Sequence, residues 1–252
     1  MARQFAYGGN SGTSAWGLYI AAGLAASVAF AANVLDVVLG FGDTALSQYG
    51  SRTAVEWFAL FQQSGFKGLY VLGLLNIVYQ IAMIMVFVGL FAAHRRTLPL
   101  PAGLAMAASF VATAIYVANN AALPMFVLSG KYAAAANDAE RAVIAAAGEA
   151  VLARGEDFTP GSFVGLFLGG IAAIVMSFVM LRGGVFGAVT AWIGIAAFTC
   201  LSIFTIWATF IPAGYAIAFY GFGMTGGLLA LAWFAGVALR FFAIARSGTR
   251  SR

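Results

Sequence analysis

The hydrophobic pattern divides the chain into six long apolar segments separated by polar intervals. The segments cover about residues 15–40, 68–92, 101–128, 159–181, 186–210 and 215–243. Each reaches the roughly 20 residues that a transmembrane helix needs. In a bilayer every backbone N–H and C=O group must be paired within the protein, and unalternated apolar runs favour helices over a closed barrel. The sequence therefore predicts an all-α, polytopic membrane protein, with residues 1–252 forming a single transmembrane domain of six helices.

The first long polar interval, residues 41–67, predicts a loop that contains a short helix. Thr53 and Glu56 have the spacing of a capping box, in which hydroxyl and carboxylate pair with the free N–H groups of a helix start. Aromatic residues follow, beginning with Trp57 and Phe58. We expect a helix over 54–65 that lies at the membrane interface and presents an aromatic surface.

The second long polar interval, residues 129–158, predicts another short helix outside the membrane. Asn137 and Glu140 form its cap, and Gly155 ends it. Before this loop, Pro124 removes a backbone hydrogen bond, which predicts a kink in the third span. After the loop, Thr159 and Pro160 have the pattern of an N-cap followed by proline at the first helical position.

Charge predicts the orientation. The termini and the two short loops on their side, 93–98 and 182–185, carry eight basic residues and no acidic ones, whereas the opposite face carries five basic and all eight acidic residues. Because Lys and Arg are retained in the cytoplasm, both termini are expected there, and the two short helices are expected to be extracytoplasmic. The net charge of +5 is thus explained by topology, and no nucleic-acid partner is expected.

Four polar residues are candidates for a ligand-binding site. Asn33 and Asp36 stand near the outer end of the first span, and Asn119 and Asn120 near the outer end of the third. Ionisable groups within a membrane often mark functional sites. Asp36 either faces the headgroup region or lines a cavity. If the two spans adjoin, the four residues form an outward-facing polar pocket beneath the helix of the 129–158 loop.

Other polar and aromatic residues have simpler interpretations. Asn76 and Gln80 are four apart and share one helical face, where such amides often bond neighbouring helices. His94, beside Arg95 and Arg96, is expected to be a surface anchor. An aromatic belt at the membrane interface is expected to include Trp207, Phe210, Tyr215 and Tyr220.

Several kinds of chemistry have no support in the sequence. A single cysteine and a single histidine provide neither an internal disulfide nor a haem ligated by histidine on both sides. No nucleotide loop, zinc motif or nucleophile–base set is recognisable. We expect no cofactor and no metal, and an enzyme is the least expected class.

Residues 117–197 carry a family resemblance. Asn119-Asn120 precedes a Leu-Pro, Lys131-Tyr132 precedes three alanines and a capped helix, and Met180-Leu181-Arg182 precedes a Trp-Ile-Gly span. In these features the chain resembles a family of bacterial multi-pass proteins known as domain of unknown function 4386. The resemblance implies a six-helix protein of the bacterial cytoplasmic (inner) membrane, and it implies no activity.

Two classes of function follow from these observations. The first is a structural or interaction subunit of a membrane assembly, in which the outer helices dock a partner membrane protein or a second copy of the chain. The alternative is a carrier or receptor for a small or lipophilic ligand, held in the outward-facing pocket. The lipid bilayer is the expected surrounding in both.

Overall fold

The computed structural model describes residues 11–41, 52–211 and 214–250, and this part of the chain is helical with no strand. Its helices are α1 (Ser11–Phe41), α2 (Ala54–Gln63), α3 (Gly65–Val71), α4 (Leu74–His94), α5 (Pro99–Asn119), α6 (Ala122–Ala134), α7 (Asp138–Gly155), α8 (Pro160–Gly183), α9 (Ala188–Phe210), α10 (Tyr215–Ala218), the π-helix η2 (Phe219–Gly223) and α11 (Met224–Arg250). In the described chain six helical segments are long and apolar enough to cross a membrane. The predicted all-α, six-span class is confirmed.

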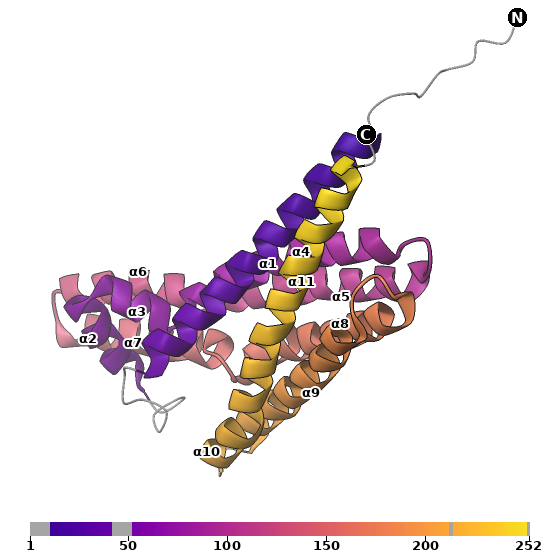
Figure 1. Ribbon diagram of the computed structural model, residues 1–252. Coiled ribbons are helices and arrows are strands. Elements are labelled where there is room, and N and C mark those ends of the chain that lie inside the picture. The colour runs from indigo at the N-terminus through magenta and orange to yellow at the C-terminus, as the bar shows by residue number, and fades with distance from the viewer. Residues whose placement is uncertain (1–10, 42–51, 212–213, 251–252) are drawn as a thin grey trace, which may run out of the picture.

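The six spans form a closed ring. Each of α1, α4, α5, α8, α9 and α11 packs against the next, and α1 also packs along α11. Figure 1 shows α1 and α11 side by side, with the start of α1 and the end of α11 at one end of the bundle. The short helices α2, α3, α6 and α7, which we call the small-helix lobe, gather at another end.

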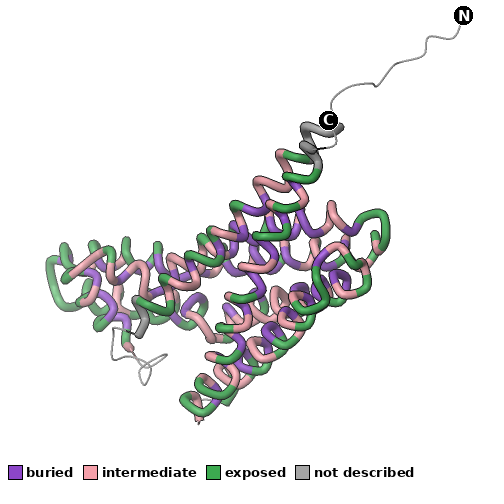
Figure 2. Tube along the Cα trace, viewed as in Figure 1, coloured by how far each residue is buried: buried purple, intermediate pink, exposed green. Residues whose placement is uncertain are grey.

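Small residues allow the spans to approach closely. On α1, Ala22, Ala26 and Ala29 are fully buried at helical spacing, so one face of this helix meets its neighbours without long side chains. Trp233 of α11 fills the centre and meets Phe198 of α9 edge to face at 5.2 Å. Figure 2 shows this distribution, with buried residues inside the bundle and exposed residues on the surfaces that would face lipid.

The small-helix lobe has a hydrophobic core of its own. The capping box is present, because Glu56 N–H donates to Thr53 Oγ1 and Thr53 N–H donates to Glu56 Oε2 at 2.7 Å. Trp57, Phe58 and Phe61 are buried against α6 and α7. The expected aromatic surface on this helix is therefore wrong: its rings pack inward and are not free to dock a partner.

Two of the expected spans are interrupted where the hydrophobic pattern continues. The second expected segment, 68–92, divides into α3 and α4 at Gly73. The φ of Gly73 is +94°, a conformation that glycine adopts without steric cost. The third segment, 101–128, divides into α5 and α6 at Asn120, whose carbonyl is the one that the missing N–H of Pro124 leaves unpaired, so the expected kink takes the form of a full break. Pro124 itself lies in the first turn of α6. Proline is tolerated there because N–H groups of a first turn have no helical partner.

Two local expectations at helix ends differ from the structure. Thr159 occupies the N-cap position of α8, but its hydroxyl donates to Glu156 O at 2.7 Å and does not cap the helix. His94 is fully buried, so it is not a surface anchor. Its Nδ1 lies 2.9 Å from Leu90 O, and its ring stacks on Phe186, which follows the turn after α8. The α8–α9 turn covers His94, while Arg95 and Arg96 stay exposed.

Asn137 does cap α7 as expected. Its side-chain oxygen accepts from Glu140 N–H at 2.9 Å, and the helix ends at Gly155. The α7 helix is tied to the start of α2, since Ala54 N–H donates to Glu149 Oε1 at 2.6 Å. This bond joins the two parts of the lobe that come from different loops.

Candidate functional site

A cavity of about 320 Å³ lies among the spans, at the end of the ring near the small-helix lobe. Its wall includes residues of α1, α4, α5, α8 and α9, of α10 and η2 in the sixth span, and of the α7–α8 loop. Ligand pockets typically have volumes of about 300–1,000 Å³. The cavity thus has the size of a small-molecule site, and every span contributes to it.

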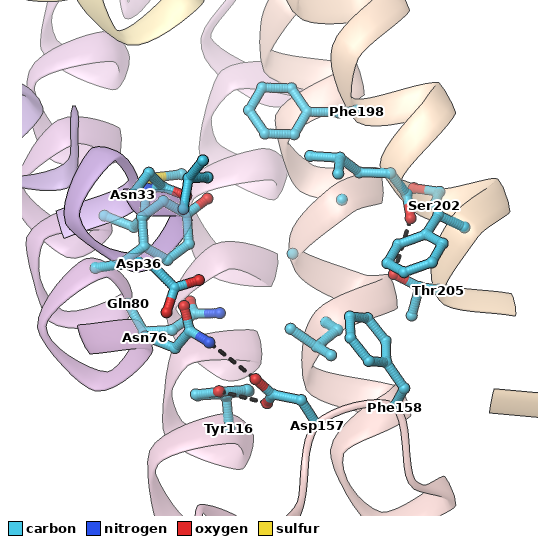
Figure 3. Close-up of a pocket in the computed structure, with 18 of the residues that line it drawn as sticks. Asn33, Asp36, Asn76, Gln80, Tyr116, Asp157, Phe158, Phe198, Ser202 and Thr205 are labelled. Atoms are coloured by element: carbon cyan, nitrogen blue, oxygen red, sulfur yellow. Dashed lines mark hydrogen bonds between the residues drawn. The ribbon is translucent and has the colours of Figure 1, made fainter. Parts of the chain in front are cut away.

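Asp157 reaches the cavity from the α7–α8 loop. Tyr116 of α5 donates its hydroxyl to Asp157 Oδ1 at 2.6 Å, and Asn76 of α4 donates its amide to Asp157 Oδ2 at 2.8 Å (Figure 3). A Cβ at Gly73, the N-cap of α4, would lie 3.6 Å from the same Oδ2. The carboxyl group therefore lies beside the N-terminus of α4. Burial raises the pKa of Asp157, and the hydrogen bonds from Tyr116 and Asn76 act against that rise.

Asp36 comes from α1 and faces the same space. It shares this wall with Asn33, Asn76 and Gln80 (Figure 3). Within the described part of the chain, Asp36 makes no hydrogen bond or ion pair. Asp157 is close enough to act on it electrostatically. One side of the cavity is therefore polar and contains two carboxyl groups, one held by neutral donors and one without a partner among described residues.

The opposite side is aromatic. Phe158 meets Phe204 at 4.8 Å between ring centroids, and Tyr215 stacks on Phe219 at 6.3 Å with an interplanar angle of 12°. Phe204 contacts both Tyr215 and Phe219. We call these four residues the aromatic wall. They present ring surface to the cavity, next to the hydroxyl-bearing residues Ser202 and Thr205 of α9.

Backbone irregularities position this wall. Phe158 has φ of +62°, a left-handed conformation that is unusual for a bulky side chain. Such strain persists only where the surroundings impose it, and it often occurs at functional sites. Phe219 begins the π-helical turn η2, another irregularity frequent at such sites. Together they turn two rings from different segments toward one space.

Close backbone contact fixes the loop that carries Asp157 and Phe158. A Cβ at Gly155 would lie 1.9 Å from Asn119 O, and a Cβ at Gly161 would lie 2.0 Å from Arg154 O. Ala121 N–H also donates to Gly155 O at 3.1 Å. Only glycine fits at these two positions, so the loop lies directly against the break between α5 and α6.

The structure separates the four predicted site residues into two pairs. Asn33 and Asp36 line the cavity, whereas Asn119 and Asn120 are absent from its described wall. Asn119 accepts from Arg154 Nε at 2.8 Å and donates to Gly161 O at 3.0 Å. Asn120 accepts from Ala122 N–H at 3.0 Å. These two asparagines brace the α7–α8 loop and cap α6.

Several cavity residues were not among the predicted site residues. Asn76 and Gln80, which share one helical face, turn that face to the cavity. Tyr116, Asp157 and Ser202 also line it, but nothing in the sequence marked them as site residues. Tyr215, assigned to an interfacial belt, lies in the aromatic wall instead. The helix of the 129–158 loop, expected to cap the pocket, is α7, and α7 contributes none of the described lining residues. The cavity is covered by the short loop after it.

These features define a class: a six-span membrane protein with a partly polar, partly aromatic cavity among its helices. No family model matches the chain, and neither a curated protein nor a solved structure matches it. The resemblance to the domain-of-unknown-function family stays a prediction from its sequence motifs. The geometry of the cavity is therefore the basis for any proposed function.

Proposed function

We propose that this protein binds a small amphipathic ligand in the cavity among its six spans, as a membrane carrier or receptor. The observation that carries the proposal is the concentration of polar groups at this one cavity. Asp36, Asn33, Asn76 and Gln80 all come from membrane-spanning helices and all line it. Polar and ionisable side chains are costly inside a bilayer, and where they gather around a cavity they commonly mark a ligand or ion pathway.

The chemistry of the two sides supports an amphipathic ligand. The polar side provides carboxylate and amide groups, and the aromatic wall provides apolar ring surface. Ligand sites commonly combine apolar and aromatic walls with a few placed polar groups that orient the ligand. A ligand with a polar head and an apolar body matches this division, whereas a wholly apolar lipid tail would leave the carboxyl groups unpaired.

The exposure of the first span at the cavity bears on how a ligand enters. The helix α1 of the first span packs along α11 of the sixth, whereas α10 and η2 of the sixth span pack against α9. Val37 lines the cavity near the end of α1, yet 42% of it is exposed. We infer that ligand reaches the cavity between these two spans.

The charge distribution supports an outward-facing site. Arg95 and Arg96 lie in the α4–α5 turn and Arg182 in the last turn of α8, at the end of the ring away from the small-helix lobe. With basic residues retained on the cytoplasmic side, the cavity opens toward the outside. Together with the family resemblance, this favours the bacterial inner membrane with both termini in the cytoplasm.

The structural-subunit hypothesis has less support from the geometry. Its docking surface was formed by the outer helices, and the rings of the 54–65 helix are buried within the lobe, which leaves only α7 of these helices exposed for docking. A protein partner or a homo-oligomer stays a prediction of the sequence alone. The cavity is the specific feature that favours ligand binding.

Native mass spectrometry of the protein purified in lipid nanodiscs tests the proposal. Leu166 lines the cavity on α8, so Leu166→Trp fills part of it, whereas Val164 lies on the same helix outside the described wall and is half exposed. We expect a bound small molecule, or an added amphipathic probe such as 4-phenyl-1-butanol, on the wild type and on Val164→Trp. We expect its loss from Leu166→Trp. Equal binding by the two variants, or none by the wild type, would contradict ligand binding in this cavity.

A further inference from the structure

The cavity has a charge imbalance that narrows the class of ligand. Its described lining residues include two carboxyl groups, Asp36 and Asp157, and no Lys, Arg or His. Both hydrogen-bond donors to Asp157 are neutral groups, an amide and a phenol. A carboxylate taken out of water is stabilised by an accompanying cation, and without one it tends to take up a proton. The described side chains supply no such cation, so a ligand is the natural source.

The aromatic wall lies across the cavity from Asp36 and beside Asp157, which directly precedes Phe158 (Figure 3). An ammonium group within about 6 Å of a ring centroid is attracted by the negative face of the ring, and the attraction grows when water is excluded. Phe158, Phe204, Tyr215 and Phe219 supply several such rings. Two carboxylates facing aromatic rings form a site that attracts an organic cation and repels an organic anion.

A third observation is independent of the acids and the rings. Ser202 lines the cavity, and only 7% of its surface is exposed. Its Oγ has no hydrogen-bond partner among the described residues. A buried hydroxyl without a partner costs about 1–3 kcal/mol. The Ser202 hydroxyl lies beside the aromatic wall, across the cavity from Asp36, so it can pair with a polar substituent on the body of a ligand, which a plain hydrocarbon lacks.

We propose that the ligand is an organic ammonium ion with at least one N–H group and an apolar body. The cationic head lies between Asp36 and Asp157, and the body lies on the aromatic wall. An inorganic metal ion fits less well, because the described residues contain no group of three His, Cys, Asp or Glu side chains that could hold one. At about 30 Å³ per water molecule, the cavity of about 320 Å³ holds the equivalent of roughly ten waters, which is space for a small arylalkyl amine.

This inference rests on the proposed ligand-binding function, and a matched series of probes tests the two separately. The probes are 4-phenylbutylamine, which is cationic at neutral pH, 4-phenyl-1-butanol, which is neutral, and 4-phenylbutyrate, which is anionic. Binding to the full-length protein in nanodiscs of uncharged lipid is measured by isothermal titration calorimetry. We expect the amine to bind at least about tenfold more tightly than the alcohol, a difference of about 1.4 kcal/mol, and the carboxylate more weakly than both.

Carboxyl-to-amide variants identify the groups responsible. Asp36→Asn removes a charge that has no described partner, and Asp157→Asn keeps an acceptor for Tyr116, so both are expected to fold. Each should weaken amine binding about tenfold or more and leave alcohol binding nearly unchanged. Asp138→Asn, an exposed acid on α7 outside the described wall, is the matched control and should bind the amine as the wild type does.

The results separate the two proposals. Equal affinities for amine and alcohol, or unchanged amine binding by both cavity variants, would overturn the ammonium assignment while leaving a ligand cavity intact. If sodium chloride and Asp138→Asn each abolish amine binding, the amine binds to surface charge. That result would also overturn the ammonium assignment. Failure of all three probes to bind the wild type, or binding that Leu166→Trp leaves unchanged for every probe, would overturn both proposals.

Discussion

Replacing Tyr116 with phenylalanine removes one hydroxyl group and keeps the ring that packs between α5 and α8. The main loss is the 2.6 Å bond to Asp157 Oδ1, and the longer 3.5 Å contact from Asn120 Nδ2 to the same hydroxyl is lost with it. Asp157 then keeps one described donor, Asn76, at 2.8 Å. The change therefore tests chiefly the hydrogen bond to a carboxylate in the cavity wall.

The magnitude follows from the environment of that bond. Hydrogen bonds to charged groups contribute about 1.5–3 kcal/mol to stability. Asp157 is only half buried, so water in the cavity can replace part of the interaction, and the lower end of the range applies. We expect Tyr116→Phe to lower the free energy of unfolding by about 1.5 kcal/mol, roughly a tenfold change in the folding equilibrium.

Equilibrium unfolding in mixed detergent micelles, followed by tryptophan fluorescence, measures this difference. Tyr79→Phe is the matched control. Tyr79 also lines the cavity, its hydroxyl makes no hydrogen bond to a described residue, and its ring keeps the edge contact with Phe234 at 5.7 Å. The control should be as stable as the wild type. The expected loss is about 1.5 kcal/mol. The reasoning would be refuted if the free energy of unfolding of Tyr116→Phe lay within about 0.5 kcal/mol of the wild-type value, or if Tyr79→Phe were destabilised as much as Tyr116→Phe.

Three further predictions concern the elements around the cavity. Gly155→Ala should destabilise the protein by more than about 3 kcal/mol because the added Cβ would overlap Asn119 O. The control Gly130→Ala, in α6 with open space around it, should stabilise the protein by about 0.5–1 kcal/mol. A similar loss of stability in both variants would contradict the close contact at Gly155. Asn137→Ala should cost about 1 kcal/mol through loss of the α7 cap, seen as faster hydrogen exchange at the start of α7 and not of α8. Hydrogen bonds from Thr53 lower the pKa of Glu56 below its ordinary value of 4.5, so the α2 cap should be complete above that pH and be lost as the pH falls through the lowered pKa; exchange at residues 54–57 that stays constant on acidification would argue against it.

Hydropathy was sufficient to predict the spans but not their breaks. The apolar pattern continues from α5 into α6, so hydropathy alone does not show the division at Asn120; Pro124 predicted a kink there but not a full break. The break also involves Gly155, whose backbone lies against Asn119 and whose carbonyl accepts from Ala121 N–H. A contact between residues 34 or more positions apart is a property of the folded chain, and local pattern does not contain it.

The residues of the candidate site could likewise be predicted from the sequence only in part. Asn33 and Asp36 could be identified because polar residues in an apolar span are conspicuous. Asp157 could not, because it belongs to a polar loop where an acid is unremarkable, and only the return of that loop toward α4 and α5 brings it to the cavity. Asn119 and Asn120 were equally conspicuous in sequence, yet they pair with the backbone of neighbouring segments.

The central claim, a water-accessible cavity that opens on the outer face, can be measured by cysteine reactivity in intact cells. The single cysteine, Cys200, is first replaced by alanine. In this background Thr205→Cys lies in the cavity wall, while Ile206→Cys is the next residue of α9, lies outside the described wall and is 41% exposed. A thiol reacts as its thiolate, which forms in water and not in lipid. A membrane-impermeant thiol reagent should label Thr205→Cys at least about ten times faster than Ile206→Cys, with Leu166→Trp slowing the reaction. Equal labelling of the two positions, or labelling only after the cells are opened, would contradict an outward-facing cavity.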